Sequence, residues 1–212
     1  MRAEGAESRL RQKSRKSREK VLETVPGLKE GINLIDKPSG VPVFQELLGH
    51  HLEPDSEAFW IDTGNEASTY ALASQDRSLM ERVRIARAFT PFQHHTLSTS
   101  LGEYSGSETE VMVLPRVNQL YLESGLKEWE RRELFQEAWS SVMRLQEEKS
   151  LKVMVSAVED SETGSMVKAD SDNRIEVGQT SQGRRYVSDS FRQLTYPGDG
   201  YIQTTVPMWR KV

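Results

Sequence analysis

The sequence of 212 residues contains no cysteine. Disulfide bonds, thiolate catalysis, and zinc or iron–sulfur clusters bound by cysteine are therefore excluded. The sequence also lacks an apolar run near the roughly 20 residues that cross a bilayer, and no apolar signal-peptide segment follows its basic start. We therefore expect a soluble, cytoplasmic protein that does not enter a membrane.

Basic residues are concentrated at the start of a chain whose net charge is −4. Residues 1–20 hold eight Lys or Arg against three Glu, a net charge of +5, which leaves −9 for the remainder. Such a segment either binds nucleic acid by releasing counterions or forms a solvated, flexible extension. The candidate DNA-binding residues are Arg9, Arg11, Lys13, Arg15, Lys16, Arg18 and Lys20.

Short apolar runs alternate with amphipathic segments in the first three quarters of the chain. This alternation predicts an α/β fold with a mainly parallel β-sheet flanked by helices. The clearest helical stripe carries Phe135, Ala138, Trp139 and Val142. Strands are expected at Ile32–Ile35, Glu57–Thr63, Glu110–Leu114 and Leu151–Val158, helices at Val43–Leu52, Pro91–Leu101 and Leu126–Lys149, and Asp76–Phe89 is either a helix or a helix followed by a strand.

The last part of the chain has a different pattern. After the polar run Glu159–Asn173, which we expect to be a mobile loop, short alternating segments are separated by Gly, Ser, Pro-Gly and Asp-Gly. This pattern is typical of antiparallel strands and hairpins. We therefore expect residues 1–22 to form a basic tail and residues 23–212 an α/β domain with antiparallel C-terminal strands.

The segment Gly31–Leu52 has the layout of a phosphate-binding element: a strand, a turn containing glycine, and a helix. In such elements, backbone N–H groups and the helix dipole bind the phosphate. The residues that a phosphate loop uses for chemistry must therefore be sought in the turn.

Several segments together resemble the ATPase core of the RecA/RadA recombinase family, over roughly Gly31 to Val206. "FWIDTGNEAS" is similar to the family's "IDTEGTF" strand, and "VRIARAFTPFQHHTL" is similar to its "IARAFNSDHQ" passage. "VMVLPRVNQLY" takes the place of the strand ending in "VDSV", whose aspartate is associated with Mg²⁺. The resemblance implies a RecA-like fold and identifies the chain as a degenerate, archaeal-type paralogue that lacks the phosphate loop.

The phosphate loop of that family, G-x-x-x-x-G-K-[ST], is largely replaced. Its glycines let the backbone fold around phosphates, its lysine reaches the β and γ oxygens, and its hydroxyl binds Mg²⁺. Here one glycine matches, Gly40, and the second glycine, the lysine and the hydroxyl become a proline, a valine and a phenylalanine. The vestigial loop consists of Lys37, Pro38, Ser39, Gly40, Val41, Pro42, Val43 and Phe44.

Two further catalytic positions of the family are also altered. Pro115 stands at the position of the metal-associated aspartate, and Gly64 at that of the glutamate that activates water, with Glu66 two residues later. Lys37 can reach a phosphate from the other end of the turn, but the metal ligands would still be missing. We expect no catalytic residue, no cofactor and a pseudo-ATPase.

No metal site is expected either. The histidines form two adjacent pairs, His50-His51 and His94-His95, and neighbours on a helix point in directions about 100° apart. Both pairs would have to converge with a carboxylate to bind a metal.

The resemblance implies a non-catalytic accessory or regulatory factor in DNA recombination and repair. Its partners would be a RecA/RadA-type recombinase, a second copy of itself, or DNA. Three alternatives stay open: a DNA-binding module that works through the basic tail, a residual ATPase with an unorthodox phosphate loop at Lys37 and Gly40, and a regulatory domain unconnected with DNA. The acidic run Glu159–Asn173 takes the place of a DNA-facing loop but has Lys168 as its only basic residue, which argues against DNA contact there.

Overall fold

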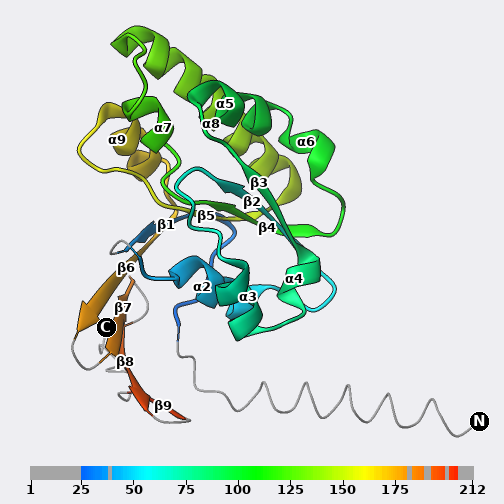
Figure 1. The fold of residues 1–212 in the computed structure, drawn as a ribbon, viewed down its shortest axis with the longest axis vertical. Coiled ribbons are helices and arrows are strands. Elements are labelled where there is room, and N and C mark those ends of the chain that lie inside the picture. Colours follow the sequence, from blue (N-terminus) through cyan, green and yellow to red (C-terminus); the bar gives the residue numbers. More distant parts are fainter. Residues whose placement is uncertain (1–24, 38–39, 181–182, 189–191, 199–200, 205–212) are drawn as a thin grey trace, which may run out of the picture.

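A single sheet organises the protein (Figure 1). The computed structural model describes residues 25–37, 40–180, 183–188, 192–198 and 201–204. Within them, nine strands follow the order β3-β2-β4-β5-β1-β6-β7-β8-β9. The first six pair in parallel, and β6 to β9 pair antiparallel. The strands are β1 (Gly31–Asp36), β2 (Glu57–Asp62), β3 (Val83–Arg87), β4 (Thr109–Leu114), β5 (Lys152–Val155), β6 (Asn173–Thr180), β7 (Gly183–Val187), β8 (Arg192–Gly198) and β9 (Tyr201–Thr204).

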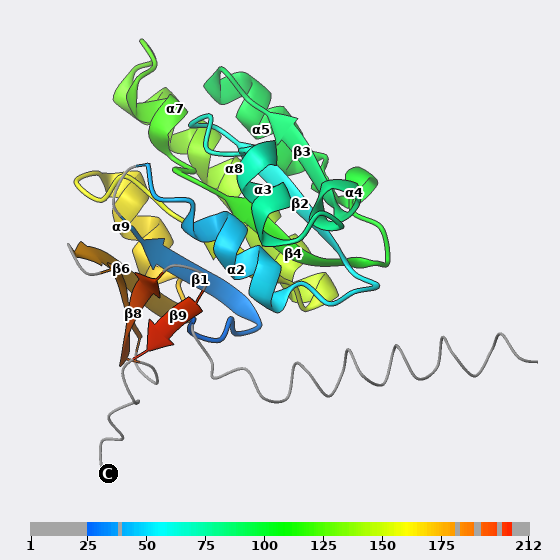
Figure 2. The same cartoon turned by 60° about the horizontal axis from the view of Figure 1, so that its bottom comes forward.

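Helices cover both faces of the parallel part of the sheet (Figure 2). One face packs against α2 (Val43–His51), α3 (Thr69–Gln75) and α4 (Leu79–Arg82). The other face packs against α5 (Pro91–Thr99), α6 (Leu101–Tyr104), α7 (Gln119–Leu122), α8 (Glu128–Lys149) and α9 (Glu162–Ala169). The sheet with its two helix layers confirms the α/β prediction, including the antiparallel C-terminal strands.

The central strands are apolar because both of their faces are covered. In β4, Val111 to Leu114 are fully buried, and their side chains alternate between the two hydrophobic clusters. The predicted stripe of α8 packs against the second cluster, where Phe135 stacks on Trp139 and meets Tyr121 edge-on. The two helix layers therefore hold the strands in place and leave the strand ends to form a site.

Local signals explain where helices start. Thr90 caps α5 by accepting a hydrogen bond from the N–H of Gln93, and Pro91 occupies the first turn, where its missing N–H costs nothing. Ser68 caps α3 in the same way. The ambiguous segment Asp76–Phe89 proves to be a helix, α4, followed by a strand, β3.

The expectation of a loop at Glu159–Asn173 is wrong, because this run contains α9. Ser161 accepts a hydrogen bond from the N–H of Gly164, and Val167 is fully buried. Gly164 lies so close to the carbonyl oxygen of Val158 that a Cβ there would collide with it. The polar composition concealed a helix that a serine cap and a close-packed glycine fix in place.

The basic tail predicted for residues 1–22 and its boundary with the domain lie within residues 1–24, outside the described residues. In the described part of the chain, no helix is both long enough and apolar enough to cross a membrane.

Candidate functional site

A cavity of about 220 Å³ lies at the carboxyl ends of the central strands. It is lined by the end of β1, by residues that follow β2 and β4, and by the segment after β5. The chain leaves β1 towards α2 on one face and leaves the neighbouring β5 towards α9 on the other. Ligands of α/β sheets bind at such switch points, so this cavity is the candidate site. Its polar lining comes from Asp36, Lys37, Glu66, Arg116, Ser156 and Glu159.

The sequence-predicted positions therefore converge at one edge of the sheet. Lys37 and Arg116 line the cavity directly, and Gly64 lies beside Arg116, whose Cδ would be 3.2 Å from a Cβ at Gly64. Pro115 is joined to the end of β2 because its carbonyl accepts a hydrogen bond of 2.6 Å from the Thr63 hydroxyl. Lys37 in the turn after β1, Gly64 after β2 and Pro115 after β4, whose roles were expected from the resemblance, thus lie in one region of the structure.

An ion pair occupies the centre of this region. The Lys37 Nζ lies 2.8 Å from the Glu66 carboxylate, and the two side chains are only 4% and 19% exposed. The same Nζ lies 5.7 Å from the centroid of the Phe44 ring. A lysine with so little access to water needs its carboxylate, which leaves it poorly placed to bind a phosphate.

Besides its ion pair with Lys37, Glu66 is held by two hydrogen bonds of its backbone. Its N–H donates to the Asp62 carboxylate, and its carbonyl accepts a hydrogen bond of 2.7 Å from the side-chain amide of Gln45 on α2. Asp62 also accepts from the N–H of Ala67. Asp62 therefore orders the turn after β2.

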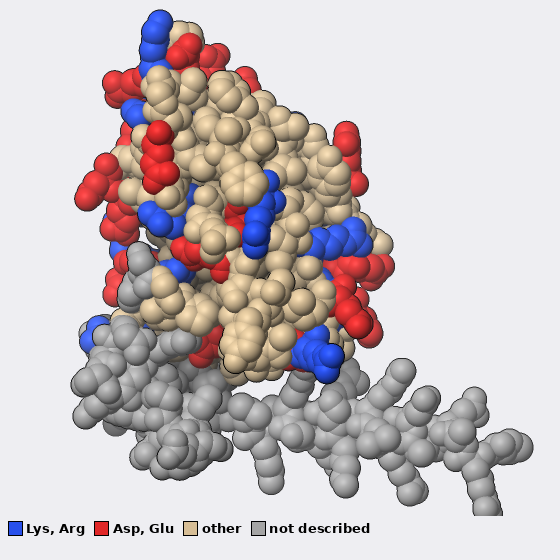
Figure 3. Space-filling model, in the orientation of Figure 1, with Lys and Arg blue, Asp and Glu red and all other residues tan. Residues whose placement is uncertain are grey.

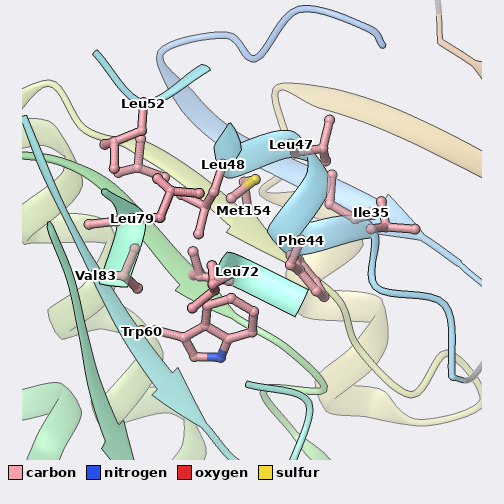
Figure 4. Close-up of a cluster of buried hydrophobic side chains, with 14 of the residues drawn as sticks. Ile35, Phe44, Leu47, Leu48, Leu52, Trp60, Leu72, Leu79, Val83 and Met154 are labelled. Atoms are coloured by element: carbon pink, nitrogen blue, oxygen red, sulfur yellow. The ribbon is translucent and has the colours of Figure 1, made fainter. Parts of the chain in front are cut away.

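The last three residues of the vestigial loop face the interior or its edge. Pro42 precedes the first turn of α2, and Val43 and Phe44 are buried in the hydrophobic core. Figure 4 shows Phe44 in the same cluster of buried side chains as Ile35, Leu72 and Trp60, and its ring meets that of Trp60 edge-on, with 5.9 Å between the ring centroids. Val43 and Phe44, which the resemblance aligns with the lysine and the magnesium ligand, thus belong to the hydrophobic core.

The first part of the loop is only partly described. Gly40 is exposed and has a positive φ of 78°, which glycine adopts at little cost. Val41 packs at the margin of the first hydrophobic cluster. Pro38 and Ser39 lie outside the described residues.

The charge of the cavity is unfavourable for polyphosphate. Three acidic side chains line it, Asp36, Glu66 and Glu159, against two basic ones, Lys37 and Arg116. Arg174 lies beside the cavity and pairs with Asp36 at 3.0 Å and Glu159 at 3.4 Å, and the hydrogen bond to Asp36 raises the pKa of Arg174. The acids are thus already engaged by internal cations.

Arg116 differs from these charges. Its side chain makes no hydrogen bond or ion pair with any of the described residues, and its backbone has a positive φ of 48°. Its N–H donates to the Ser156 hydroxyl at 2.9 Å. A single cation held by a strained turn can bind one carboxylate or phosphate group, but it cannot neutralise a triphosphate.

Sequence reasoning missed most of the polar contacts around the cavity. Asn118, fully buried, donates to the Val158 carbonyl and to the hydroxyls of Ser161 and Thr163. These partners are 40 to 45 residues away in the sequence. No local pattern reports such contacts.

The histidines do not converge. His51 bonds the carbonyl of Pro26 beside α2, whereas His95 bonds Glu137 on the other face of the sheet. Among the described residues, no group of three His, Cys, Asp or Glu side chains is arranged to hold a metal ion.

His94 is buried and predicts a pH dependence of stability. Burial, with a smaller contribution from His95, lowers the pKa of His94 to about 4 from 6.5. Between pH 6.5 and pH 4, His94 is protonated in the unfolded chain but neutral in the native state. The free energy of unfolding therefore falls as the pH drops towards 4. Between pH 7 and pH 5 we expect a loss of about 2 kcal/mol from this group.

Urea unfolding of the parent and of His94→Gln at both pH values checks this prediction. Glutamine keeps a polar group near the Tyr121 hydroxyl, which lies 2.8 Å from Nδ1 of His94, but does not titrate. The matched control is His95→Gln, which should retain the pH dependence of the parent. An unchanged pH dependence in His94→Gln would show that another group is responsible.

The candidate DNA-binding residues of the tail lie within residues 1–24, outside the description. The basic residues near β3 are already paired: Arg84 with Glu57 at 2.6 Å and Arg87 with Asp62 at 3.6 Å.

Neither a scan against protein-family models nor a search of curated proteins found a match for this chain.

Proposed function

We propose that the protein is a non-catalytic, RecA/RadA-like accessory or regulatory factor in DNA recombination and repair, located in the cytoplasm. It acts by binding a protein partner, such as a recombinase, or DNA. The family assignment rests on the resemblance of several segments in the same order along the chain. Fold and resemblance alone do not fix a function, so the proposal must be carried by the site.

The observation that carries it is the Lys37–Glu66 ion pair beside buried Phe44. Phosphoryl transfer depends on a lysine and a metal ion that neutralise the phosphate charge. Here the resemblance puts Val43 at the position of that lysine and Phe44 at that of the metal-binding hydroxyl, and the nearby Lys37 is neutralised by Glu66. This arrangement supports a scaffold that has kept its strand, turn and helix without the chemistry.

Nucleotide binding is the first test. Titration of Mg²⁺-ATP by calorimetry should give no saturable heat up to 1 mM, about the range of weak ligands, and ATP turnover should equal the buffer background. Lys37→Ala is the matched variant for the residual-ATPase alternative. Tight ATP binding, or Mg²⁺-dependent turnover that disappears in Lys37→Ala, would overturn the non-catalytic assignment.

DNA binding is the second test, on the full chain and on a variant with the seven candidate tail cations changed to Gln. Binding should weaken as salt rises, with a slope in log K against log salt that the neutralised tail reduces by up to about six. The effect of the protein on ATP turnover by a RadA-type recombinase should be measured in parallel. If the protein neither binds DNA nor alters ATP turnover by the recombinase, the proposed function fails.

A further inference from the structure

An apolar groove of about 300 Å³ lies between α5 and the start of α8, away from the candidate site. Its floor is formed by Phe92, Leu126, Trp129 and Leu134. Phe92 is 58% exposed and Trp129 60%, although large aromatic side chains are usually covered. Two exposed aromatic rings beside a groove are typical of a binding surface.

The rim of the groove is acidic. Glu130, Glu133 and Glu137 are three and four residues apart on α8 and form one stripe. None of the residues that line the groove is Lys or Arg. Figure 3 shows several acidic side chains and one basic side chain at the top of the molecule, where α8 begins, beside an uncharged area over α5. The groove therefore suits a basic segment that carries an apolar side chain.

Residues 1–22 of the chain have this chemistry. Leu10 stands between Arg9 and Arg11, and five further basic residues follow before residue 21. The tail carries +5, whereas the rest of the chain carries −9. The two parts of different copies therefore attract one another at long range.

The position of the tail favours a second copy over the same one. Val25, the first described residue, packs in the cluster under α2, on the face of the sheet opposite to α5 and α8. From Val25 to Leu10 the chain spans at most about 50 Å when fully extended. To reach its own groove the tail would have to pass around the sheet to the other face, whereas the tail of another copy can approach the groove from solvent.

We infer that the groove between α5 and α8 binds the basic N-terminal tail of a second copy of this chain, with Leu10 between Phe92 and Trp129 and the neighbouring cations near the three glutamates. Tail and groove are different surfaces, so the contact is head-to-tail. It needs neither nucleotide nor DNA and is independent of the proposed function.

The experiment measures self-association of the full chain by sedimentation velocity. At 50 mM NaCl and tens of micromolar protein, species larger than the monomer should form, and 500 mM NaCl should dissociate them, because exposed charges are screened. Glu133→Lys and Trp129→Ser should each weaken association at least five-fold. Glu133 is the best rim position to change because it is exposed, whereas Glu130 bonds the N–H of Lys127 and Glu137 bonds His95.

Two controls separate this contact from general charge effects. Glu148→Lys makes the same change at an exposed position of α8 outside the groove lining, and it should associate like the parent. The second control mixes a groove variant, Glu133→Lys with Trp129→Ser, with the variant whose seven tail cations are Gln. Each alone should be a monomer, and the mixture should form dimers but nothing larger, because one intact groove meets one intact tail.

Three results would overturn the inference. One is a full chain that stays monomeric at 50 mM NaCl up to 100 µM, about the weakest affinity worth assigning. Another is association that Glu133→Lys and Glu148→Lys weaken equally. The third is a mixture of groove and tail variants that stays monomeric, which would mean that tail and groove do not meet.

Discussion

Replacing Glu66 with leucine should lower the free energy of unfolding by about 3 kcal/mol or more. The Lys37 side chain is only 4% exposed, and the substitution removes the carboxylate that lies 2.8 Å from its ammonium group. A buried charge that loses its partner costs far more than the pair contributes, because its hydration is not recovered. Urea denaturation followed by the fluorescence of buried Trp60, which packs against Phe44, measures the change.

The double variant Lys37→Met with Glu66→Leu separates this explanation from a loss of packing. It removes both charges together and should recover most of the stability that Glu66→Leu loses. Arg84 and Glu57 provide the matched control, since this pair is as short, 2.6 Å, but its arginine is 55% exposed. Replacing them in the same way should change stability by less than about 1 kcal/mol. Additive losses at Lys37 and Glu66 would contradict the assignment of a buried, coupled pair.

Most of the sheet could be predicted from the sequence because its strands report their own environment. Val111 to Leu114 form a continuous apolar run, as a strand covered on both faces must. The long helix α8 could also be predicted from the sequence, because Phe135, Trp139 and Val142 repeat at helical spacing. Helix α9 was missed because Val167 is the one apolar residue among its buried residues, and its cap becomes informative only when the close contact at Gly164 is known.

The candidate site could be predicted only in part. The sequence predicted that the turn after β1 contains Lys37 and Gly40, but the pairing of Lys37 with Glu66 joins residues from two strand ends that are not neighbours in the sheet. Local patterns carry no information on which charges meet across a fold. A lysine in a turn has the same sequence signal whether it faces water, a phosphate or a glutamate.

Introducing the second glycine, the lysine and the hydroxyl of the phosphate-loop pattern should destroy the fold before it creates an ATPase. In the variant Pro42→Gly, Val43→Lys, Phe44→Thr, the new lysine replaces a fully buried valine, and threonine removes the ring that packs against Trp60. Loss of a buried aromatic ring costs about 3 to 5 kcal/mol, and a buried, unpaired ammonium adds several more. Since domains are stable by about 5 to 15 kcal/mol, we expect the cooperative unfolding transition to be lost or strongly weakened.

Single variants show which change is responsible. Pro42→Gly supplies the missing glycine and should stay within about 1 kcal/mol of the parent, and Phe44→Leu should cost less than about 3 kcal/mol. Neither should bind ATP, because Lys37 is still paired with Glu66 and no lysine has been introduced at position 43. A folded triple variant with Mg²⁺-dependent ATP turnover would mean that the loop alone had silenced an otherwise intact site. Loss of folding would mean instead that these residues have become part of the hydrophobic core, so that catalysis could return only together with a repacked interior.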